Sequence, residues 1–216
     1  MMEQKDIENL RQDYAAASLS EKDVDANPVR QFDKWFNEAI NAKVYEPNAM
    51  TLATATPDGR PSARVVLLKG FSDDGFKFYT NYLSRKGREL AKNPNAALVF
   101  LWGDMERQIR IEGTIEKLDK WYSEKYFHSR PKKSQIGAVA SPQSQEIDGR
   151  EQLEARMQEL EAQYADSEVP KPAHWGGYIL KPRMIEFWQG RRSRLHDRIV
   201  YKKTDNKNWK IVRLAP

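Results

Sequence analysis

The sequence predicts a β-rich α+β fold, in which a β-barrel or curled antiparallel sheet carries peripheral helices. About eight short segments have the alternating pattern of strands, and turn-forming residues separate many of them. The expected helices do not alternate regularly with the strands, and the sequence contains no GxGxxG or GxxxxGK[ST] phosphate loop. A parallel doubly wound sheet is therefore disfavoured, and any nucleotide-like ligand must be held by side chains.

The first part of the chain is expected to form two helices followed by a meander of strands. Residues 6–19 and 28–44 have helical spacing, and Asn27 and Pro28 are of the types favoured at an N-cap and at the first helical position. Strands are expected next at residues 50–56, 60–71 and 75–81. Asp-Gly turns between these segments favour antiparallel hairpins.

Further strands and short helices are expected in the rest of the chain. Ser84 is of the type that caps a helix, here ending near Lys92. Residues 131–149 are rich in Ser, Gln, Pro and Gly, which predicts a long polar loop. The other expected elements are helices at 119–129 and 150–165, strands at 96–102 and 108–118, and three or four strands from Trp175 onward, the last hairpin turning at 204–208.

Composition limits the possible functions. The chain has 216 residues, enough for one domain, and its net charge of +5 favours anionic partners such as nucleic acid, phosphorylated metabolites or an acidic membrane surface. The absence of cysteine excludes disulfides, thiolate nucleophiles and iron–sulfur clusters, and the three histidines lack metal-ligand spacing, so no metal is expected. The N-terminus lacks the apolar core of a signal peptide, which predicts a cytoplasmic protein.

Residues 185–198, with the sequence IEFWQGRRSRLHDR, concentrate cations and aromatic rings. The first four residues have the bias of a strand, and the residues after Gly190 alternate as a second strand would, which places Arg194, His196 and Arg198 on one face. Guanidinium groups bind phosphate in a bidentate manner and imidazole exchanges protons near neutral pH, so this face suits an anionic ligand. An exposed hairpin with solvated charges remains the alternative.

Three other cationic clusters could bind phosphate. Arg64 and Lys69 are five residues apart, so they lie on opposite faces of a regular strand and can share a ligand only through a bulge or a strand end. Arg85 and Lys86 begin a predicted helix, where the macrodipole disfavours cations and a bound anion would relieve the conflict. The third cluster has ordinary phosphate ligands at a helix end, Tyr126, Arg130 and Ser134, although a basic surface loop would look similar.

Together these segments resemble the pyridoxamine 5′-phosphate oxidase family. The resemblance is carried by IEFWQGRRSRLHDR, RVVLLK, FYTNYLSRK, ERQIRIEG, YFHSRPKKSQIGA, SPQS, HWGGY and the terminal RLAP, and it covers nearly the whole chain. It implies a homodimer with an FMN-binding split β-barrel and flavin mononucleotide (FMN) at the subunit interface. It also implies oxidation of pyridoxamine or pyridoxine 5′-phosphate to pyridoxal 5′-phosphate, with O2 reduced to hydrogen peroxide. Residues 1–216 would then form one domain, with a mobile segment at 1–20 and substrate-contacting strands at 175–216.

The resemblance also implies roles for particular residues. Flavin contacts are implied for Arg64, Val65, Leu67, Lys69, Tyr79, Thr80, Arg85, Lys86, Gln108, Gln143, Ser144, Trp188 and Arg198. The substrate phosphate would be bound by Lys69, Tyr126, Arg130 and Ser134. Arg194 and His196 would be the catalytic residues at the reacting end of the substrate. Arg11 and Tyr14 resemble an N-terminal segment that closes over the substrate.

Three alternatives stay open at this point. The first is another flavin-binding oxidoreductase of the same barrel class that acts on a different phosphorylated substrate. The second is a nucleic-acid-binding barrel, in which aromatic rings stack on bases and arginines contact phosphates, and which would be colourless. The third is a carrier that stores pyridoxal phosphate without consuming oxygen.

Overall fold

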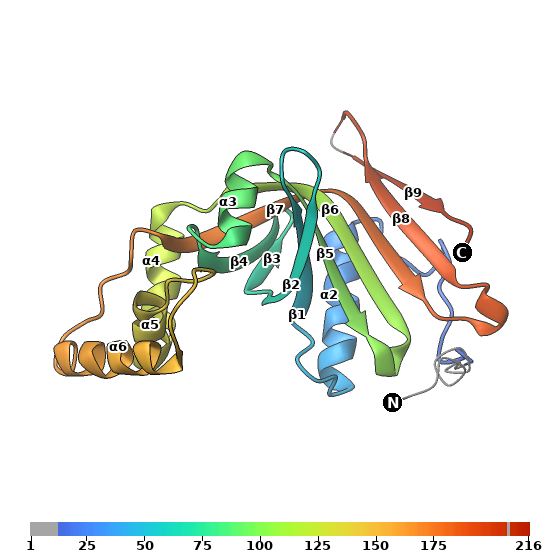
Figure 1. The fold of residues 1–216 in the computed structure, drawn as a ribbon. Helices are drawn as coiled ribbons and strands as arrows, with labels where there is room; N and C mark the ends of the chain where they lie inside the picture. Colours follow the sequence, from blue (N-terminus) through green and yellow to red (C-terminus); the bar gives the residue numbers. More distant parts are fainter. Residues whose placement is uncertain (1–12, 207) are drawn as a thin grey trace, which may run out of the picture. The chain divides into compact units, whose positions relative to one another are not determined.

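The computed structural model describes residues 13–206 and 208–216, and contacts between Cα atoms divide the chain into two compact units. Within the described residues, the terminal unit comprises 13–47, 98–111 and 183–216, and the central unit comprises 48–97 and 112–182. Along the sheet the strands are ordered β2 (Pro61–Leu67), β1 (Ala49–Ala55), β5 (Asn95–Trp102), β6 (Arg107–Lys117), β7 (Trp175–Gln189), β4 (Gly75–Asn81) and β3 (Gly70–Ser72) (Figure 1). Strands β5, β6 and β7 contribute residues to both units.

The terminal unit contains helix α2 (Pro28–Asn41) and strands β8 (Asp197–Lys203) and β9 (Trp209–Arg213). The side chain of Asn27 accepts a hydrogen bond from the Val29 amide at 2.7 Å, so the predicted N-cap is confirmed. The helix buries Phe32 and Trp35, and each ring centroid lies 5.2 Å from a core phenylalanine of the same unit, Phe100 and Phe187 respectively. This aromatic contact anchors the amphipathic face that the sequence predicted.

Antiparallel pairing in the terminal unit continues from β7 through β8 to β9. Ile185 pairs with Tyr201, which in turn pairs with Ile211. The hairpin between β8 and β9 closes where the Thr204 amide donates to the Asn208 carbonyl, at the turn expected from the sequence. These pairings place β9, the last strand of the chain, in the same sheet as the strand that precedes the basic segment.

Antiparallel hairpins form most of the central unit. Ala49 pairs with Leu67 in the β1–β2 hairpin, and β4 pairs with the first residues of β7. Gly75 permits the second pairing, because a Cβ atom there would lie 2.0 Å from the Leu180 carbonyl oxygen and its φ of +139° is rarely adopted by other residues. The predicted meander is therefore confirmed for these strands, although the expected strand 60–71 is interrupted between β2 and β3.

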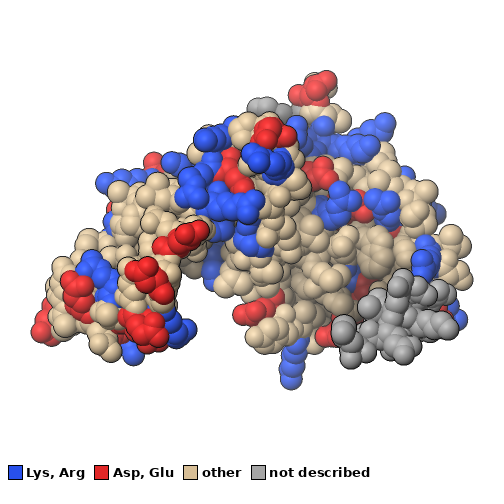
Figure 2. All heavy atoms as spheres, in the orientation of Figure 1, with Lys and Arg blue, Asp and Glu red and all other residues tan. Residues whose placement is uncertain are grey.

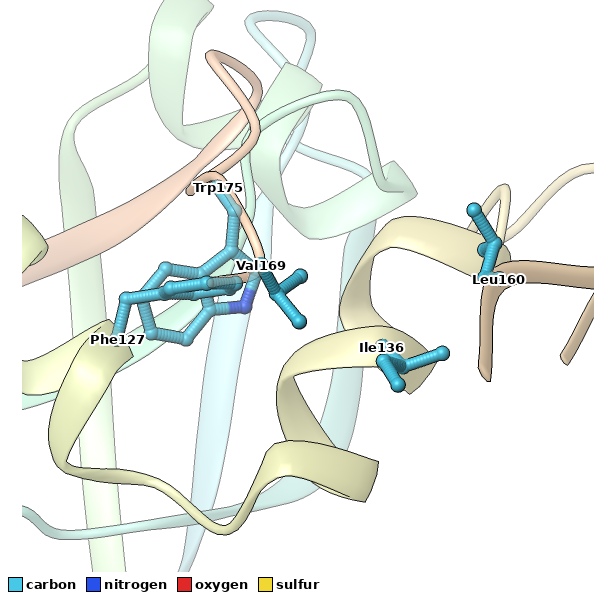
Figure 3. Close-up of a cluster of buried hydrophobic side chains, with 5 residues drawn as sticks. All are labelled: Phe127, Ile136, Leu160, Val169 and Trp175. Carbon is cyan, nitrogen blue, oxygen red and sulfur yellow. The ribbon is translucent and has the colours of Figure 1, made fainter. Parts of the chain in front are cut away.

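Four helices of the central unit surround a hydrophobic cluster or border the sheet. Helix α3 (Arg85–Lys92) is capped by Ser84, as the sequence predicted, and α4 (Lys120–Ser129) by Asp119, and they are followed by α5 (Lys132–Ala140) and α6 (Arg150–Gln163). The cluster joins buried side chains from α4, α5, α6, the following loop and the start of β7: Phe127, Ile136, Leu160, Val169 and Trp175 (Figure 3). Burying such a side chain stabilises a fold by about 1.5–3 kcal/mol relative to an exposed position.

Two expectations about where helices form are wrong. Residues 131–149 were expected to be a loop, but α5 forms there because Ile136 enters the hydrophobic cluster and the Gln135 side-chain amide donates to the Arg130 carbonyl oxygen at 2.8 Å. The helix expected at 6–19 is absent from residues 13–19, where the backbone amides of Ala16 and Leu19 donate to carboxylates distant in sequence. Residues 6–12 of that expectation lie outside the described part of the chain.

The described part of the chain contains no helix that is both long enough and apolar enough to cross a bilayer.

Candidate functional site

The central unit contains an open pocket of about 660 Å³, a volume typical of small-molecule sites. Its walls come from β2, β4, α3, α4, α5, the loop after α5 and the start of β7. Four cations and three aromatic rings line it: Arg64, Lys69, Lys86, Arg130, Tyr79, Tyr126 and Trp175. Figure 2 shows Lys and Arg side chains gathered over α3 and the strands beside it.

Arg64 is held in place by a hydrogen-bond relay that ends on a buried carboxylate. Its guanidinium donates to Thr54 Oγ1 at 2.6 Å and to Ser62 Oγ at 2.5 Å. Both hydroxyls donate in turn to Glu89 Oε2. Burial alone would raise the pKa of Glu89, but these hydrogen bonds and one from Arg85 outweigh it and hold the pKa at about 2. The ionised carboxylate therefore fixes the orientation of Arg64 before any ligand binds.

Lys86 is a buried cation whose direct partners are all neutral. Its Nζ donates to Thr80 Oγ1 at 3.2 Å, Ser84 Oγ at 3.2 Å and Gln143 Oε1 at 3.0 Å. Burial, assisted by the charge of Arg64, lowers the pKa of Lys86 to about 8. Among the described residues no carboxylate lies within ion-pair distance of this ammonium. A bound anion would supply the missing countercharge.

Aromatic rings and an arginine form the other side of the pocket. The rings of Tyr79 and Tyr126 stack with centroids 3.9 Å apart, and Trp175 lies nearly parallel to Tyr79 at 5.6 Å. The Arg130 guanidinium lies 4.9 Å from the Trp175 ring, and its Nη2 donates to the Ser134 carbonyl oxygen at 2.7 Å. Burial raises the pKa of Tyr79 and lowers that of Arg130.

The second nitrogen of the Arg130 guanidinium is unsatisfied. Nη1 is buried and has no hydrogen-bond partner in the described structure. A buried donor without an acceptor costs about 1–3 kcal/mol, and more when the group is charged. Because Arg130 lines the pocket and guanidinium groups donate to phosphate in a bidentate manner, a rotation of this side chain toward a bound phosphate would give Nη1 an acceptor.

A second cluster lies in the terminal unit, around His196. The His196 ring lies 4.6 Å from Trp188, and the edge of Tyr14 contacts both rings, with centroids 5.8 and 5.7 Å away. The Arg191 backbone amide donates to His196 Nδ1 at 3.1 Å, so Nδ1 is an acceptor and Nε2 is left for a ligand. The exposed Arg194 forms no hydrogen bond or ion pair with any residue in the described ranges.

The expected strand containing Arg194 and His196 is wrong. Residues 192–194 form a short 3-10 turn, in which Ser193 and Arg194 have φ of 57° and 59°, and β8 begins only at Asp197. This left-handed backbone cannot extend as a strand, so the three residues do not share a strand face. Arg198 does lie on β8, where it pairs with the buried carboxylate of Glu186 at 2.8 Å, which raises the pKa of Arg198.

The structure brings most of the expected central-unit residues around one pocket. The residues that line it are Arg64, Val65, Leu67, Lys69, Tyr79, Thr80, Lys86, Tyr126, Arg130, Ser134 and Gln143. Arg64 and Lys69 share it because Lys69 lies beyond the end of β2, which is the strand-end geometry considered from their spacing. Arg85, 62% exposed and paired with Glu89, and Ser144 are not among the residues that line the pocket.

The remaining expected residues lie elsewhere. Tyr14, Gln108, Trp188, Arg194, His196 and Arg198 belong to the terminal unit, and Arg11 lies outside the described residues. Sequence reasoning missed Trp175 and Glu89 as parts of the site. The only sequence feature that pointed to Glu89 was its position four residues after Arg85, where an ion pair is favoured on a helix.

A β-rich sheet with a cationic, aromatic-lined pocket defines a class of proteins that bind flat, anionic small molecules. A family model described as "Pyridoxamine 5′-phosphate oxidase" matches residues 36–164, and a model described as "Pyridoxine 5′-phosphate oxidase C-terminal dimerisation region" matches residues 175–216. The pyridoxine/pyridoxamine 5′-phosphate oxidases of Nostoc punctiforme and Salinibacter ruber are 57% and 56% identical to this chain, covering 98% and 97% of it and 99% of each relative.

A solved structure shows the same fold. PhzG from Burkholderia lata, determined in complex with tetrahydrophenazine-1-carboxylic acid, is 35% identical with a TM-score of 0.88, and the match covers 94% of this chain and 100% of that one. The chain therefore belongs to the pyridoxamine 5′-phosphate oxidase family, and it carries the C-terminal dimerisation region of that family. The split-barrel fold expected from the sequence is confirmed.

Proposed function

We propose that this protein oxidises pyridoxamine 5′-phosphate and pyridoxine 5′-phosphate to pyridoxal 5′-phosphate, with FMN as cofactor and O2 as the final electron acceptor. Relatives named for this activity, 56–57% identical along nearly the whole chain, support the substrate class. The observation that carries the proposal is a pair of cations in one pocket, Lys86 and Arg130, neither of which has an ion-pair partner among the described residues. Cofactor and substrate each bring one phosphate, and each cation suits one of them.

The pocket residues fit the phosphate of FMN. Lys86 is buried beside Thr80 and Gln143, and Arg64 is oriented by its relay to Glu89, so two cations stand ready at fixed positions. When bound, FMN supplies the two-electron acceptor for the substrate and passes the electrons to O2. The chain contributes the binding groups and the orientation.

A second set of residues in the same pocket fits the substrate phosphate. Arg130 would turn its unpartnered Nη1 toward the phosphate and donate to it, and Lys69, Tyr126 and Ser134 line the same pocket and can add charge or hydrogen bonds. Tyr126 is already held by its stack on Tyr79, so its hydroxyl is positioned at low entropic cost. Binding the phosphate in this way fixes one end of the substrate.

Arg194 and His196 would orient the reacting end. Because His196 Nδ1 accepts the Arg191 amide, the neutral imidazole carries its proton on Nε2, where it can donate a hydrogen bond to the amine or alcohol of the substrate. Arg194 has no competing partner among the described residues and can contact the pyridine ring or its hydroxyl. Such positioning of reacting groups supplies a large part of the rate in many enzymes.

We further propose that the protein is a homodimer with FMN at the subunit interface. The matched dimerisation region at residues 175–216 supports this. Val65, 67% exposed, and Leu67 both lie on β2 and line the pocket, so a partner subunit would cover apolar surface next to the ligand. Mixing an inactive Lys86→Met enzyme with an inactive Arg194→Ala enzyme should restore activity if the two subunits share a site.

The decisive test is a visible absorption spectrum of the purified protein, repeated after pyridoxamine 5′-phosphate is added without oxygen. A yellow flavin band that bleaches and returns with air is the expected result. A yellow band that does not change when the substrate is added would keep the flavin but require another electron donor. A colourless protein that takes up no added FMN would overturn the proposal.

A further inference from the structure

Arg213, on the last strand, links the N-terminal segment, residues 13–21, to Asp197, the residue that follows His196. Its Nε and Nη2 donate to the two carboxylate oxygens of Glu21, each at 2.9 Å, in bidentate geometry. Its Nη1 donates to Asp197 Oδ1 at 2.7 Å, and Nη2 also reaches the Leu19 carbonyl oxygen at 3.0 Å. One side chain thus links the segment, β9 and the residue that follows His196 in sequence.

Two further hydrogen bonds hold the same segment. The Leu19 amide donates to Asp197 Oδ2 at 3.0 Å, and the Ala16 amide donates to Glu106 Oε2 at 2.9 Å. The segment has no helical hydrogen bonds of its own, so these side chains replace the backbone acceptors that a helix would have supplied. Its position therefore depends on side-chain anchors, of which the pairing of Arg213 with Glu21 carries the most hydrogen bonds between two side chains.

The anchored segment carries Tyr14 to the His196 cluster. The Tyr14 ring meets Trp188 and His196 edge-on, and it packs so closely on Gly190 that a Cβ atom there would lie 2.8 Å from Tyr14 Cβ. The ring has room only because the residue after β7 is glycine. Moving the segment by an ångström or two would remove Tyr14 from the imidazole.

The ion pair persists across the working pH range. Hydrogen bonds from Arg213 lower the pKa of Glu21 to about 2, and Glu21 and Asp197 together raise the pKa of Arg213. The two side chains are 48% and 38% exposed, so salt screens the pair and its effect should be moderate.

We infer that Arg213 and Glu21 are positioning residues that hold Tyr14 against His196, and that they set how tightly the substrate is retained rather than how fast it reacts. This inference rests on the proposed function for its catalytic consequence, although the anchoring itself does not. A segment that contacts the bound substrate equally in the ground state and the transition state changes KM and leaves kcat alone.

The test compares Glu21→Gln with the wild-type holoenzyme. Glutamine keeps the shape but removes the charge, while the bond from Arg213 to Asp197 remains. We expect the KM for pyridoxamine 5′-phosphate to rise about fivefold with kcat and flavin content unchanged, as an exposed bidentate pair allows. Hydrogen exchange of the Ala16 and Leu19 amides, followed by mass spectrometry, should become several-fold faster.

Two further variants keep the outcome interpretable. Arg213→Lys retains the charge without the bidentate fork and should give a smaller rise in KM than Arg213→Met. Glu159→Gln removes a comparably exposed ion pair with Arg156 on α6 and should change neither readout.

Each outcome bears on a different claim. Unchanged exchange at Ala16 and Leu19 in Glu21→Gln would overturn the anchoring, and faster exchange with a changed kcat and constant KM would overturn the retention role. A wild-type protein without oxidase activity would instead overturn the proposed function, while the exchange measurement would still test the anchor.

Discussion

The pocket of the central unit and the basic turn of the terminal unit both concentrate arginines, but they prepare them differently. In the pocket, Arg64 is fixed by Thr54, Ser62 and the carboxylate of Glu89 before a ligand arrives. In the turn, Arg194 has no partner within the described ranges. Preorganised cations favour tight binding of a resident group, whereas a free arginine suits a substrate that must enter and leave.

The backbone is also more regular in the pocket than in the basic turn. Most pocket residues lie on regular strands and helices, while Ser193 and Arg194 are consecutive residues with left-handed φ. Such conformations cost about 1 kcal/mol each for residues other than glycine. The turn is therefore destabilised by the backbone conformation that orients the Arg194 side chain, whereas the backbone of the pocket carries no such cost.

The largest expected effect is a loss of activity without a loss of flavin when the turn alone is altered. Arg194→Ala should lower kcat/KM for pyridoxamine 5′-phosphate by on the order of 100-fold, because the reacting end of the substrate loses its orienting cation. Flavin content, read from visible absorption, should stay at the wild-type level. Arg192→Ala, in the same exposed turn, is the control and should remain near wild type. Loss of flavin from Arg194→Ala would place Arg194 on the cofactor side instead.

Arg130→Gln tests the pocket from the substrate side. We expect the KM for pyridoxamine 5′-phosphate to rise roughly 20-fold, because a charged hydrogen bond to phosphate is worth about 1.5–3 kcal/mol. Steady-state kinetics with unphosphorylated pyridoxamine should show little change between the variant and the wild type. Lys132→Gln serves as the control, since Lys132 is exposed and donates to the Ala165 carbonyl oxygen. An equal effect on both substrates would contradict phosphate recognition by Arg130.

The lowered pKa of Lys86 predicts that FMN binding in the pocket depends on pH. Phosphate binding by the protonated ammonium would be strongest well below its pKa of about 8 in the free protein, and it would weaken as the pH rises through that value. Fluorescence titration of the apoprotein should give a dissociation constant for FMN up to about tenfold higher at pH 9 than at pH 7, because the protonated fraction of Lys86 falls about tenfold over that range. Lys86→Arg should abolish this dependence, and riboflavin, which lacks the phosphate, should not show it. A flat profile in the wild type would contradict the assignment.

The smallest expected effect concerns the strain in the turn. Ser193→Gly should raise the free energy of unfolding by about 0.5 kcal/mol, because glycine adopts φ near +57° without steric cost. Urea denaturation would measure it, with Ser193→Ala as the matched control that keeps the Cβ atom. A clear loss of stability in the glycine variant would show that the turn is not strained.

Local chemistry predicted the fold where it was unambiguous. Asn27 and Ser84 both cap helices at the positions expected, and the Asp-Gly turns delimit hairpins as their residue types indicate. The helix α5 was missed because its polar composition hides Ile136, whose burial depends on side chains far away in sequence. Tertiary packing of one residue outweighed the composition of its neighbours.

The candidate site was predicted in part for the same reason. The cations were visible as clusters in the sequence. Only the folded structure shows that they group around one pocket. The relay from Arg64 to Glu89 was not visible, since it depends on the register that pairs Thr54 with Ser62. Nor could alternation of residue types reveal the left-handed turn at Ser193, which no pattern of period two or 3.6 encodes.

Trp175 gives the pocket an optical property of its own. Its indole is stacked near two tyrosine rings and lies 4.9 Å from the Arg130 guanidinium, so a phosphate bound by that arginine would change the charges around the indole. The emission of this tryptophan would then depend on occupancy of the anion site. Trp175 would thereby serve as an intrinsic fluorescent reporter at the position where the substrate is expected to bind.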